Sequence, residues 1–421
     1  MDTENKIYKR SRLMYIFEAA IEYFISILVS GSFLATLTKE LGLSDSLTGV
    51  LSSVISLGCL FQLLSIFIRP KGIKKFVILM SVANQILFMI LYIIPIFNIP
   101  SNLKSVFFVL LIFSAYFIYN IAHPKKINWL MSIVDDKKRG SFTANKEIVS
   151  LISGMVISFA MGALIDRFKE IGEMRAALIL SALVLLILTV LHTLTMIFTV
   201  EKITETSDKS DFKNNLKEIL KNKNILSVAL VFVFYYIITY ISTPFYGTYQ
   251  INELGFSLKL ATALTMTGSI VRIFVSRFWG RYADKKGFAP MIEKCFISMA
   301  LAFLSVSFAV PSNGKIMFIL YNIFHGIALG GINSALINLV FDYVSVEKRA
   351  DSLAICQAIS GAFGFVTTLC ISPVITAFQK NGNVFLDFTL YGQQFVSIIA
   401  FIISVLAVVY IHKSFKEKNK A

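Results

Sequence analysis

The sequence predicts an all-α integral membrane protein whose twelve transmembrane helices form two pseudo-symmetric six-helix bundles. Of its 421 residues, 56% are hydrophobic and only 15% are charged, whereas about 25% of the residues in an ordinary soluble protein are charged. The apolar residues occur in long runs, and a bilayer core about 30 Å thick needs roughly 20 of them per helix. Short motifs also recur at a nearly fixed shift along the chain, which indicates an internal repeat.

Twelve apolar runs long enough to span a bilayer lie between charged or Pro-, Gly- and Asn-rich breaks. They cover residues 14–37, 46–68, 76–97, 105–133, 147–168, 175–200, 225–250, 259–279, 290–310, 315–341, 352–378 and 393–412. The first run follows four basic residues but contains two glutamates and precedes eleven further runs. We therefore interpret it as a retained helix and not as a signal peptide.

The distribution of basic residues predicts the orientation. With both termini inside, the cytoplasmic segments hold 29 of the 40 Lys and Arg residues and the external loops hold 8. Such a bias follows the positive-inside rule. Topology thus accounts for the net charge of +15, and no basic patch remains for nucleic acid. We expect a monomeric, multi-pass protein of a bacterial plasma membrane with both termini cytoplasmic.

Three pairs of motifs define the internal repeat. The pairs are Glu40–Ser44 with Glu253–Ser257, Tyr119–His123 with Tyr321–His325, and Arg139-Gly140 with Arg349-Ala350, at shifts of 213, 202 and 210 residues. Because the members of each pair lie in or directly after corresponding runs, they predict two parallel repeats. We expect one bundle in residues 1–200, a solvated linker in 201–224 and a second bundle in 225–421.

A motif between the eighth and ninth runs resembles a known family. It reads Gly-Arg-Tyr-Ala-Asp-Lys-Lys-Gly, from Gly280 through Asp284 and Lys285 to Gly287. This resembles the G-x-x-x-D-[RK]-x-G loop of the major facilitator superfamily, and the twelve runs and two-fold repeat extend the resemblance over essentially the whole chain. The equivalent segment of the first half has Arg69 where the Asp is expected, so the chain departs from the family there.

The resemblance implies a transporter that works by alternating access, and it gives Asp284 a role in cytoplasmic gating. In the family, this loop packs across the bundle interface and steadies the outward-facing state. The alternative is that the motif serves only as a topology signal. Asp342 and Arg349, with Arg139 as the repeat counterpart of Arg349, resemble the acidic-x6-Arg pattern of sugar-type members, although a surface ion pair without gating value fits equally.

Charged residues at membrane depth are candidate site residues, because charge is expensive there. Glu18 and Glu22 are four residues apart and share a helix face with Ser26 and Ser30. The resemblance places the first, fourth, seventh and tenth runs around a central cavity, so we expect this stripe to face it. Glu22 is then a proton-binding candidate, whereas Glu18 can instead snorkel to the interface.

The fourth run contains His123, Pro124, Lys125 and Lys126. Either the helix ends at His123, which makes both lysines ordinary cytoplasmic charges, or it continues to about Val134. The repeat favours the longer helix, because the tenth run extends to a matching length. At least one of the two lysines should then face the cavity, and Pro124 should kink the helix or leave open carbonyls.

The tenth run presents Asn322, His325 and Asn333 on one face. His325 is a candidate proton carrier or substrate partner, and a helix-to-helix hydrogen bond is the alternative. His192 is interpreted as structural, because the resemblance makes the sixth run peripheral. Arg272 needs an anionic partner, for which Glu147, Glu22 and the substrate are the candidates.

We therefore predict a secondary transporter for a small polar, anionic or zwitterionic solute, coupled to protons or to sodium. No phosphate-binding P-loop, HExxH, GxSxG or CxxC motif occurs, so we expect neither an enzyme nor a cofactor. The four cysteines lie in or beside apolar runs, and we expect no metal site or disulfide. A multidrug exporter is the alternative, although the fifth run lacks the Gly-Pro motif of such exporters, and a transporter-like sensor is the alternative from another class.

Overall fold

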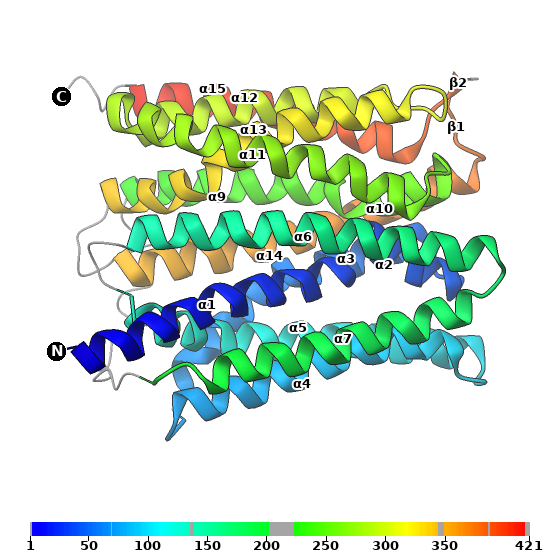
Figure 1. Cartoon of the computed structure of the whole chain (residues 1–421). Coiled ribbons are helices and arrows are strands. Elements are labelled where there is room, and N and C mark those ends of the chain that lie inside the picture. The colour runs from blue at the N-terminus through cyan, green and yellow to red at the C-terminus, as the bar shows by residue number, and fades with distance from the viewer. Residues whose placement is uncertain are drawn as a thin grey trace. The chain divides into compact units, whose positions relative to one another are not determined.

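The computed structural model describes residues 2–68, 70–134, 139–201, 223–343, 349–385 and 388–416 (Figure 1). Its helices in the first half are α1 (Asp2–Leu28), α2 (Gly31–Glu40), α3 (Asp45–Phe61), α4 (Ile73–Ile93), α5 (Ser101–Ser132), α6 (Arg139–Glu170) and α7 (Met174–Ile197). Those in the second half are α9 (Lys223–Ser242), α10 (Tyr246–Thr248), α11 (Leu258–Lys286), α12 (Phe288–Ser307), α13 (Gly314–Tyr343), α14 (Arg349–Lys380) and α15 (Gly392–Lys416). The strands β1 (Val384–Phe385) and β2 (Phe388–Thr389) form a short antiparallel hairpin.

The predicted membrane-spanning architecture is confirmed. Within the described residues, 11 helices are long and apolar enough to cross a membrane, and α1 with α2 makes a twelfth, bent span. Between 22% and 61% of the apolar stretch of each span is buried inside the protein. Large apolar side chains such as Phe274, at 76% exposure, therefore remain available to lipid.

The first span is not the single straight helix that hydropathy predicts. It bends by 41° between Leu28 and Gly31, and Gly31 has a φ of +52°, which favours glycine. Ser30 lies in this break, and its hydroxyl donates to the carbonyl of Ile27. The predicted polar stripe therefore ends at Ser26, whose hydroxyl also returns to its own helix.

The helix α5 is as long as the repeat predicts. It continues from Ser101 to Ser132 through Pro124, so Lys125 and Lys126 both lie within the span. By contrast, the predicted loop from Gly280 to Gly287 is wrong, because α11 stays helical to Lys286 and only Gly287 separates it from α12. Lys285 and Lys286 favour the C-terminal end of a helix, and Gly287 ends it with a φ of +85°.

The chain packs as two compact units. The first comprises residues 1–44, 61–206 and 257–262, and the second comprises 45–60, 207–256 and 263–421. The predicted domain boundaries stay a prediction, because most of the linker 201–224 lies outside the described residues. The packing adds one feature that sequence did not indicate, namely that residues 45–60 pack in the second unit.

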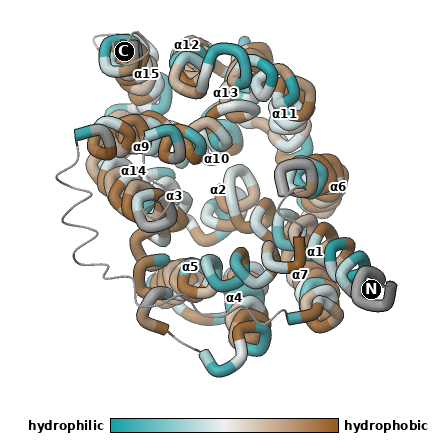
Figure 2. The backbone as a smooth tube through the Cα atoms, turned by 90° about the vertical axis from the view of Figure 1, so that its left-hand side faces the viewer, coloured by the Kyte–Doolittle hydropathy of each residue, from teal (hydrophilic) through white to brown (hydrophobic). Residues whose placement is uncertain are grey.

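Within the first unit, α1 packs against α6 and α7, and α4 packs against α5 and α7. Figure 2 looks along these helices and shows α7 beside α1, with α4 and α5 next to each other. Side chains of α1, α4, α5 and α7 therefore converge between these four helices.

Within the second unit, α3 approaches α14 closely. The Ser56 hydroxyl donates to the carbonyl of Gly361 at 2.9 Å, and a Cβ added to Gly361 would lie 2.3 Å from the Ser56 carbonyl oxygen. Only glycine permits this approach of two backbones. The same unit pairs α9 with α14 and α15, and α12 with α13 and α15.

The repeat is visible in matching local conformations. Gly42 and Gly255, the central residues of the first motif pair, have φ values of +67° and +66°. Asn120 and Asn322, from the second pair, each donate a side-chain N–H to the carbonyl four residues earlier. Equivalent sequence positions thus adopt equivalent structures in the two halves.

Candidate functional site

The ammonium of Lys126 on α5 lies between two carboxylates of α1. Its Nζ atom donates to Glu18 Oε1 at 3.1 Å and also contacts Glu22 Oε2. The side chains of Lys126 and Glu18 are 3% and 2% exposed, and that of Glu22 is 24% exposed. The structure thus brings together three of the residues that sequence selected, and Glu18 is buried instead of snorkelling.

The neighbouring residue Lys125 points elsewhere. Adjacent positions on a helix differ by about 100° in direction, and Lys125 Nζ donates to the carbonyl of Ser65 at 2.8 Å. Ser65 belongs to a 3₁₀ turn, Gln62–Phe67, which follows α3. Of the two lysines, Lys126 is therefore the one in contact with the acidic residues of α1.

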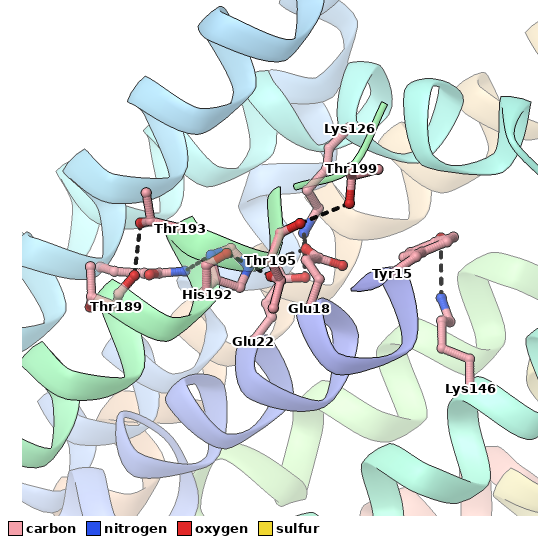
Figure 3. A network of polar contacts seen from close by, with 11 residues as sticks. Tyr15, Glu18, Glu22, Lys126, Lys146, Thr189, His192, Thr193, Thr195 and Thr199 are labelled. Atoms are coloured by element: carbon pink, nitrogen blue, oxygen red, sulfur yellow. Dashed lines mark hydrogen bonds and ion pairs between the residues drawn. The ribbon is translucent and has the colours of Figure 1, made fainter. Parts of the chain in front are cut away.

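His192 on α7 belongs to the same network, as Figure 3 shows. Its side chain is fully buried, and Nε2 lies 3.1 Å from Glu18 Oε1. The sequence alone gives His192 a structural role, because the family resemblance makes its helix peripheral. The signal that could have found it is the presence of an ionisable side chain within an otherwise apolar span.

Gln85 on α4 completes the network on the other side of His192. Its Nε2 lies 2.9 Å from His192 Nδ1, and the residue is 3% exposed. Because the carboxylate of Glu18 can only accept a hydrogen bond, His192 Nε2 carries the proton there. Nδ1 of a neutral His192 then accepts from the Gln85 amide, so one tautomer satisfies both contacts.

The charges of this network do not balance. Two carboxylates face one ammonium, which leaves one excess negative charge when His192 is neutral. A further cation, Lys146 on α6, lies against Tyr15 instead: its Nζ is 3.4 Å from the Tyr15 hydroxyl and 4.9 Å from the centre of its ring (Figure 3). Because uncompensated charge is costly in a buried position, the network favours uptake of one positive charge.

Glu18, Glu22 and His192 present ligand atoms within 4.8 Å of one another, a spacing that suits a metal ion. In this structure Lys126 places its ammonium against both carboxylates. A metal ion in the same position would meet that positive charge at close range. The arrangement is therefore better described as an internal ion pair than as a metal site.

A small cavity adjoins the network. It is lined by Glu22, Ser81, Asn84, Gln85, Tyr119, Ala122, His123 and Lys126. Its volume of about 10 Å³ has room for about one water molecule. Two buried polar atoms of this lining, Gln85 Oε1 and His123 Nδ1, have no hydrogen-bond partner among the described residues.

The site residues predicted on α13 lie in the second unit. His325 stacks on Tyr321, with ring centroids 5.0 Å apart, and its buried Nε2 has no hydrogen-bond partner in the described part of the chain. The repeat counterparts Tyr119 and His123 also contact each other, with centroids 5.0 Å apart. The shared motif thus builds, in each half, a tyrosine–histidine pair whose buried ring nitrogen meets no hydrogen-bond partner within the described ranges.

The other site candidates of the second unit are Asn322, Asn333 and Arg272. Asn322 is buried and bonds to its own helix, and Asn333 Oδ1 accepts from the Tyr235 hydroxyl at 3.5 Å. Arg272 on α11 packs its backbone beside Gly330. Because Glu147 belongs to the first unit and Arg272 to the second, their predicted pairing stays a prediction.

The predicted gating residues lie at helix ends. Gly280, Asp284 and Lys285 occupy the last turns of α11, where Asp284 is exposed. Arg139 and Arg349 begin α6 and α14, but their side chains are outside the described part of the structure, as is Arg69. Asp342 is exposed near the end of α13, so its pairing with Arg349 stays a prediction.

The fold and this network define a multi-pass α-helical membrane protein that carries a charged site buried among its helices. The chain belongs to the Major Facilitator Superfamily, whose family model matches residues 16–369. No curated protein matches the sequence.

Solved structures of transporters share the fold. A mutant of the nucleoside transporter NupG matches with a TM-score of 0.75 and 14% identity, over 96% of this chain and 100% of that one. A D-xylose-proton symporter matches with 0.72 and 14%, over 96% of each chain. A bacterial homologue of the human lysosomal transporter Spinster matches with 0.67 and 13%, over 97% and 96%. The chain therefore has the fold of major facilitator transporters.

Proposed function

We propose that this protein is a proton-coupled secondary transporter for a small polar solute that carries an anionic or zwitterionic group. The observation that carries the proposal is the position of the Lys126 ammonium against the buried carboxylate of Glu18 and the partly buried carboxylate of Glu22. A transporter of this type needs a group that gains and loses charge inside the membrane, and such groups are rare outside functional sites.

Coupling follows from competition for Lys126. An anionic group of the substrate is attracted to the ammonium and weakens its contact with Glu22, which is the more exposed of the two carboxylates. Glu22 then loses its counter-ion and binds a proton, because a carboxylate without a partner is disfavoured in a low-dielectric site. Substrate and proton thus bind together and leave together, while the two halves expose the site alternately to each side.

Direction and membrane placement are part of the same proposal. Binding of substrate together with a proton supports symport, driven inward by a proton gradient across the plasma membrane, with both termini in the cytoplasm. The D-xylose-proton symporter that shares the fold couples a polar solute to protons. Sodium is the alternative coupling ion.

The proposal is tested in proteoliposomes that contain a pH-sensitive dye. Nucleosides, pentoses, short peptides and small carboxylates are added in turn, because the first three classes follow the transporters that share the fold. Small carboxylates or short peptides, which carry an anionic group, should acidify the lumen, whereas the neutral nucleosides and pentoses should not. An imposed inward proton gradient should raise the uptake of the class that responds. Glu22→Gln should abolish the proton signal, whereas Glu170→Gln, at an exposed carboxylate, should not.

Three results would contradict the proposal. Uptake that depends on sodium and is insensitive to pH would assign the coupling ion differently. Full proton coupling in Glu22→Gln would remove the role of that carboxylate. Binding of a solute without any flux would favour a sensor.

A further inference from the structure

Gln85 lies between the buried ion-pair network and the cavity beside it. Its Nε2 contacts His192 Nδ1 at 2.9 Å, while its Oε1 is buried and has no hydrogen-bond partner among the described residues. The residue is 3% exposed and lines the same cavity as Glu22 and His123. A buried amide oxygen without a partner is unfavourable and calls for a physical explanation.

The hydrogen-bond requirements of His192 determine which end of the Gln85 amide faces it. When the imidazole is neutral, Nε2–H donates to Glu18, and Nδ1 needs a donor, which is the Gln85 NH₂ group. When the imidazole is protonated, Nδ1–H needs an acceptor, which is Gln85 Oε1. The two states require opposite amide orientations, and the terminal torsion of a Gln side chain allows both.

We propose that the Gln85 amide turns over when His192 gains or loses a proton and thereby changes the hydrogen-bonding character of the cavity. With neutral His192 the cavity wall presents an amide oxygen, which selects a donor such as a water or a hydroxyl group. With protonated His192 it presents an amide NH₂, which selects an acceptor such as a carboxylate. This deepens the proposed function and rests on it, because it makes an acceptor group of the substrate bind together with the proton.

The charged and titratable groups around His192 favour protonation of its ring, which is the event that turns the Gln85 amide. Glu18 and Glu22 of α1 present carboxylate oxygens within 4.8 Å of the ring. Tyr119, His123 and Lys126 of α5 line the adjoining cavity or contact these carboxylates, and Lys146 of α6 lies beyond them against Tyr15 of α1. The two carboxylates exceed the directly paired ammonium by one charge, so a single proton neutralises the network. That proton resides on His192 before it passes to Glu22, whose oxygen lies within 4.8 Å of the ring nitrogen. If protonation of His192 raises the affinity of the cavity for a ligand, then by linkage binding of that ligand raises the proton affinity of His192 by the same factor.

The test uses the four histidines of the chain. Purified protein in nanodiscs carries ¹⁵N-labelled imidazoles, and spectra are recorded across a pH series, with His123→Gln, His325→Gln and His412→Gln for assignment. Neutral His192 should hold its proton on Nε2. Gln85→Glu should keep His192 doubly protonated to a pH higher by about one to three units, because a carboxylate then faces Nδ1.

Gln85→Met removes the acceptor that the protonated ring requires, so His192 should accept its second proton only at a pH lower by about one unit or more. Asn84→Leu is the matched control. Asn84 directly precedes Gln85 on α4, is about equally buried and lines the same cavity. Its amide, however, donates to the carbonyl of Ala115. This control should leave the titration of His192 unchanged.

Infrared difference spectra of protein with ¹³C-labelled Gln carbonyls test the turnover itself. Lowering the pH through the His192 titration should shift a labelled carbonyl band in the wild type, and the shift should be missing in Gln85→Met and in His192→Gln. A proton on Nδ1 of neutral His192, or unchanged titration in both Gln85 variants, overturns the inference. If Gln85→Met does not fold, Gln85→Glu and the infrared shift still decide it.

These measurements need no substrate, so their outcome is separate from that of the transport assay. Once a substrate is identified, Gln85→Met should lose proton-driven accumulation at least tenfold while retaining exchange of substrate across the membrane. Loss of both activities with normal His192 spectra would contradict the inference and leave the proposed function standing.

Discussion

His192 Nε2 lies 3.1 Å from Glu18 Oε1, across 174 residues of sequence. The contact joins α7 to α1, and the same Glu18 oxygen accepts from Lys126 of α5. One carboxylate thus holds three helices of the first unit together and sets the protonation pattern of the site.

Replacement of Lys126 by Met should destabilise the protein by about 3–5 kcal/mol, because it leaves the buried carboxylate of Glu18 and the partly buried carboxylate of Glu22 without a counter-ion. The loss should be smaller at low pH, since protonation removes the unpaired charges, and larger as the pH rises. Thermal unfolding in detergent at several pH values measures both effects. Lys125→Met, which removes the bond to the Ser65 carbonyl, should change stability much less, and an equal loss in the two variants would contradict the assignment.

Glu18→Gln should cost about 1–3 kcal/mol, because a neutral amide replaces a carboxylate that bonds to both Lys126 and His192. Glu22→Gln should cost less, since Glu22 is partly exposed. Proton coupling should show the reverse order, with the larger loss in Glu22→Gln. Unfolding curves and proton-flux assays on the same two samples measure both rankings. If one variant shows the larger loss of stability and also the larger loss of proton coupling, the separate roles of Glu18 and Glu22 are refuted.

His325→Phe should keep the stack on Tyr321 but remove the ring nitrogen that has no partner among the described residues. We expect stability within about 1 kcal/mol of the wild type and at least a tenfold loss of solute uptake, expressed mainly as a raised KM. The control is His412→Gln, which alters an exposed contact with Glu293. If uptake is normal in His325→Phe, His325 serves only in packing.

Gly361→Ala should destabilise the second unit by about 1–3 kcal/mol, because the new Cβ would lie 2.3 Å from the Ser56 carbonyl oxygen and 2.6 Å from Cys59 Cβ. Gly72→Ala is the matched control, since a Cβ there meets no atom within 4 Å. Differential scanning fluorimetry of both variants measures the contrast. Equal melting temperatures would mean that α3 and α14 can separate at this point without loss of stability.

Much of the fold could be predicted because it depends on local properties of the sequence. Runs of apolar residues set the number of spans, and motif pairs such as Tyr119–His123 and Tyr321–His325 established the repeat. The repeat also predicted that α5 continues past Pro124, where hydropathy alone left the end of the helix open. Glu18, Glu22 and Lys126 were selected because ionisable residues at membrane depth are few.

The bend after Leu28 and the helical extension to Lys286 could not be predicted in this way. Apolar run length does not register a change of helix direction inside a span, and a helix can continue beyond the bilayer wherever polar residues favour its end. Both features are decided by backbone conformation at single residues, Gly31 and Gly287.

The sequence by itself determined that this chain crosses the membrane about twelve times, that its halves repeat, and that a few charges lie within the spans. Only the tertiary structure decided that Lys126 meets both glutamates and that His192 and Gln85 continue the network. The physical reason is that spacing along a helix fixes which residues share a face, whereas helix rotation and tilt are set by packing against neighbours. Contacts across four helices therefore arise only when all four are in place.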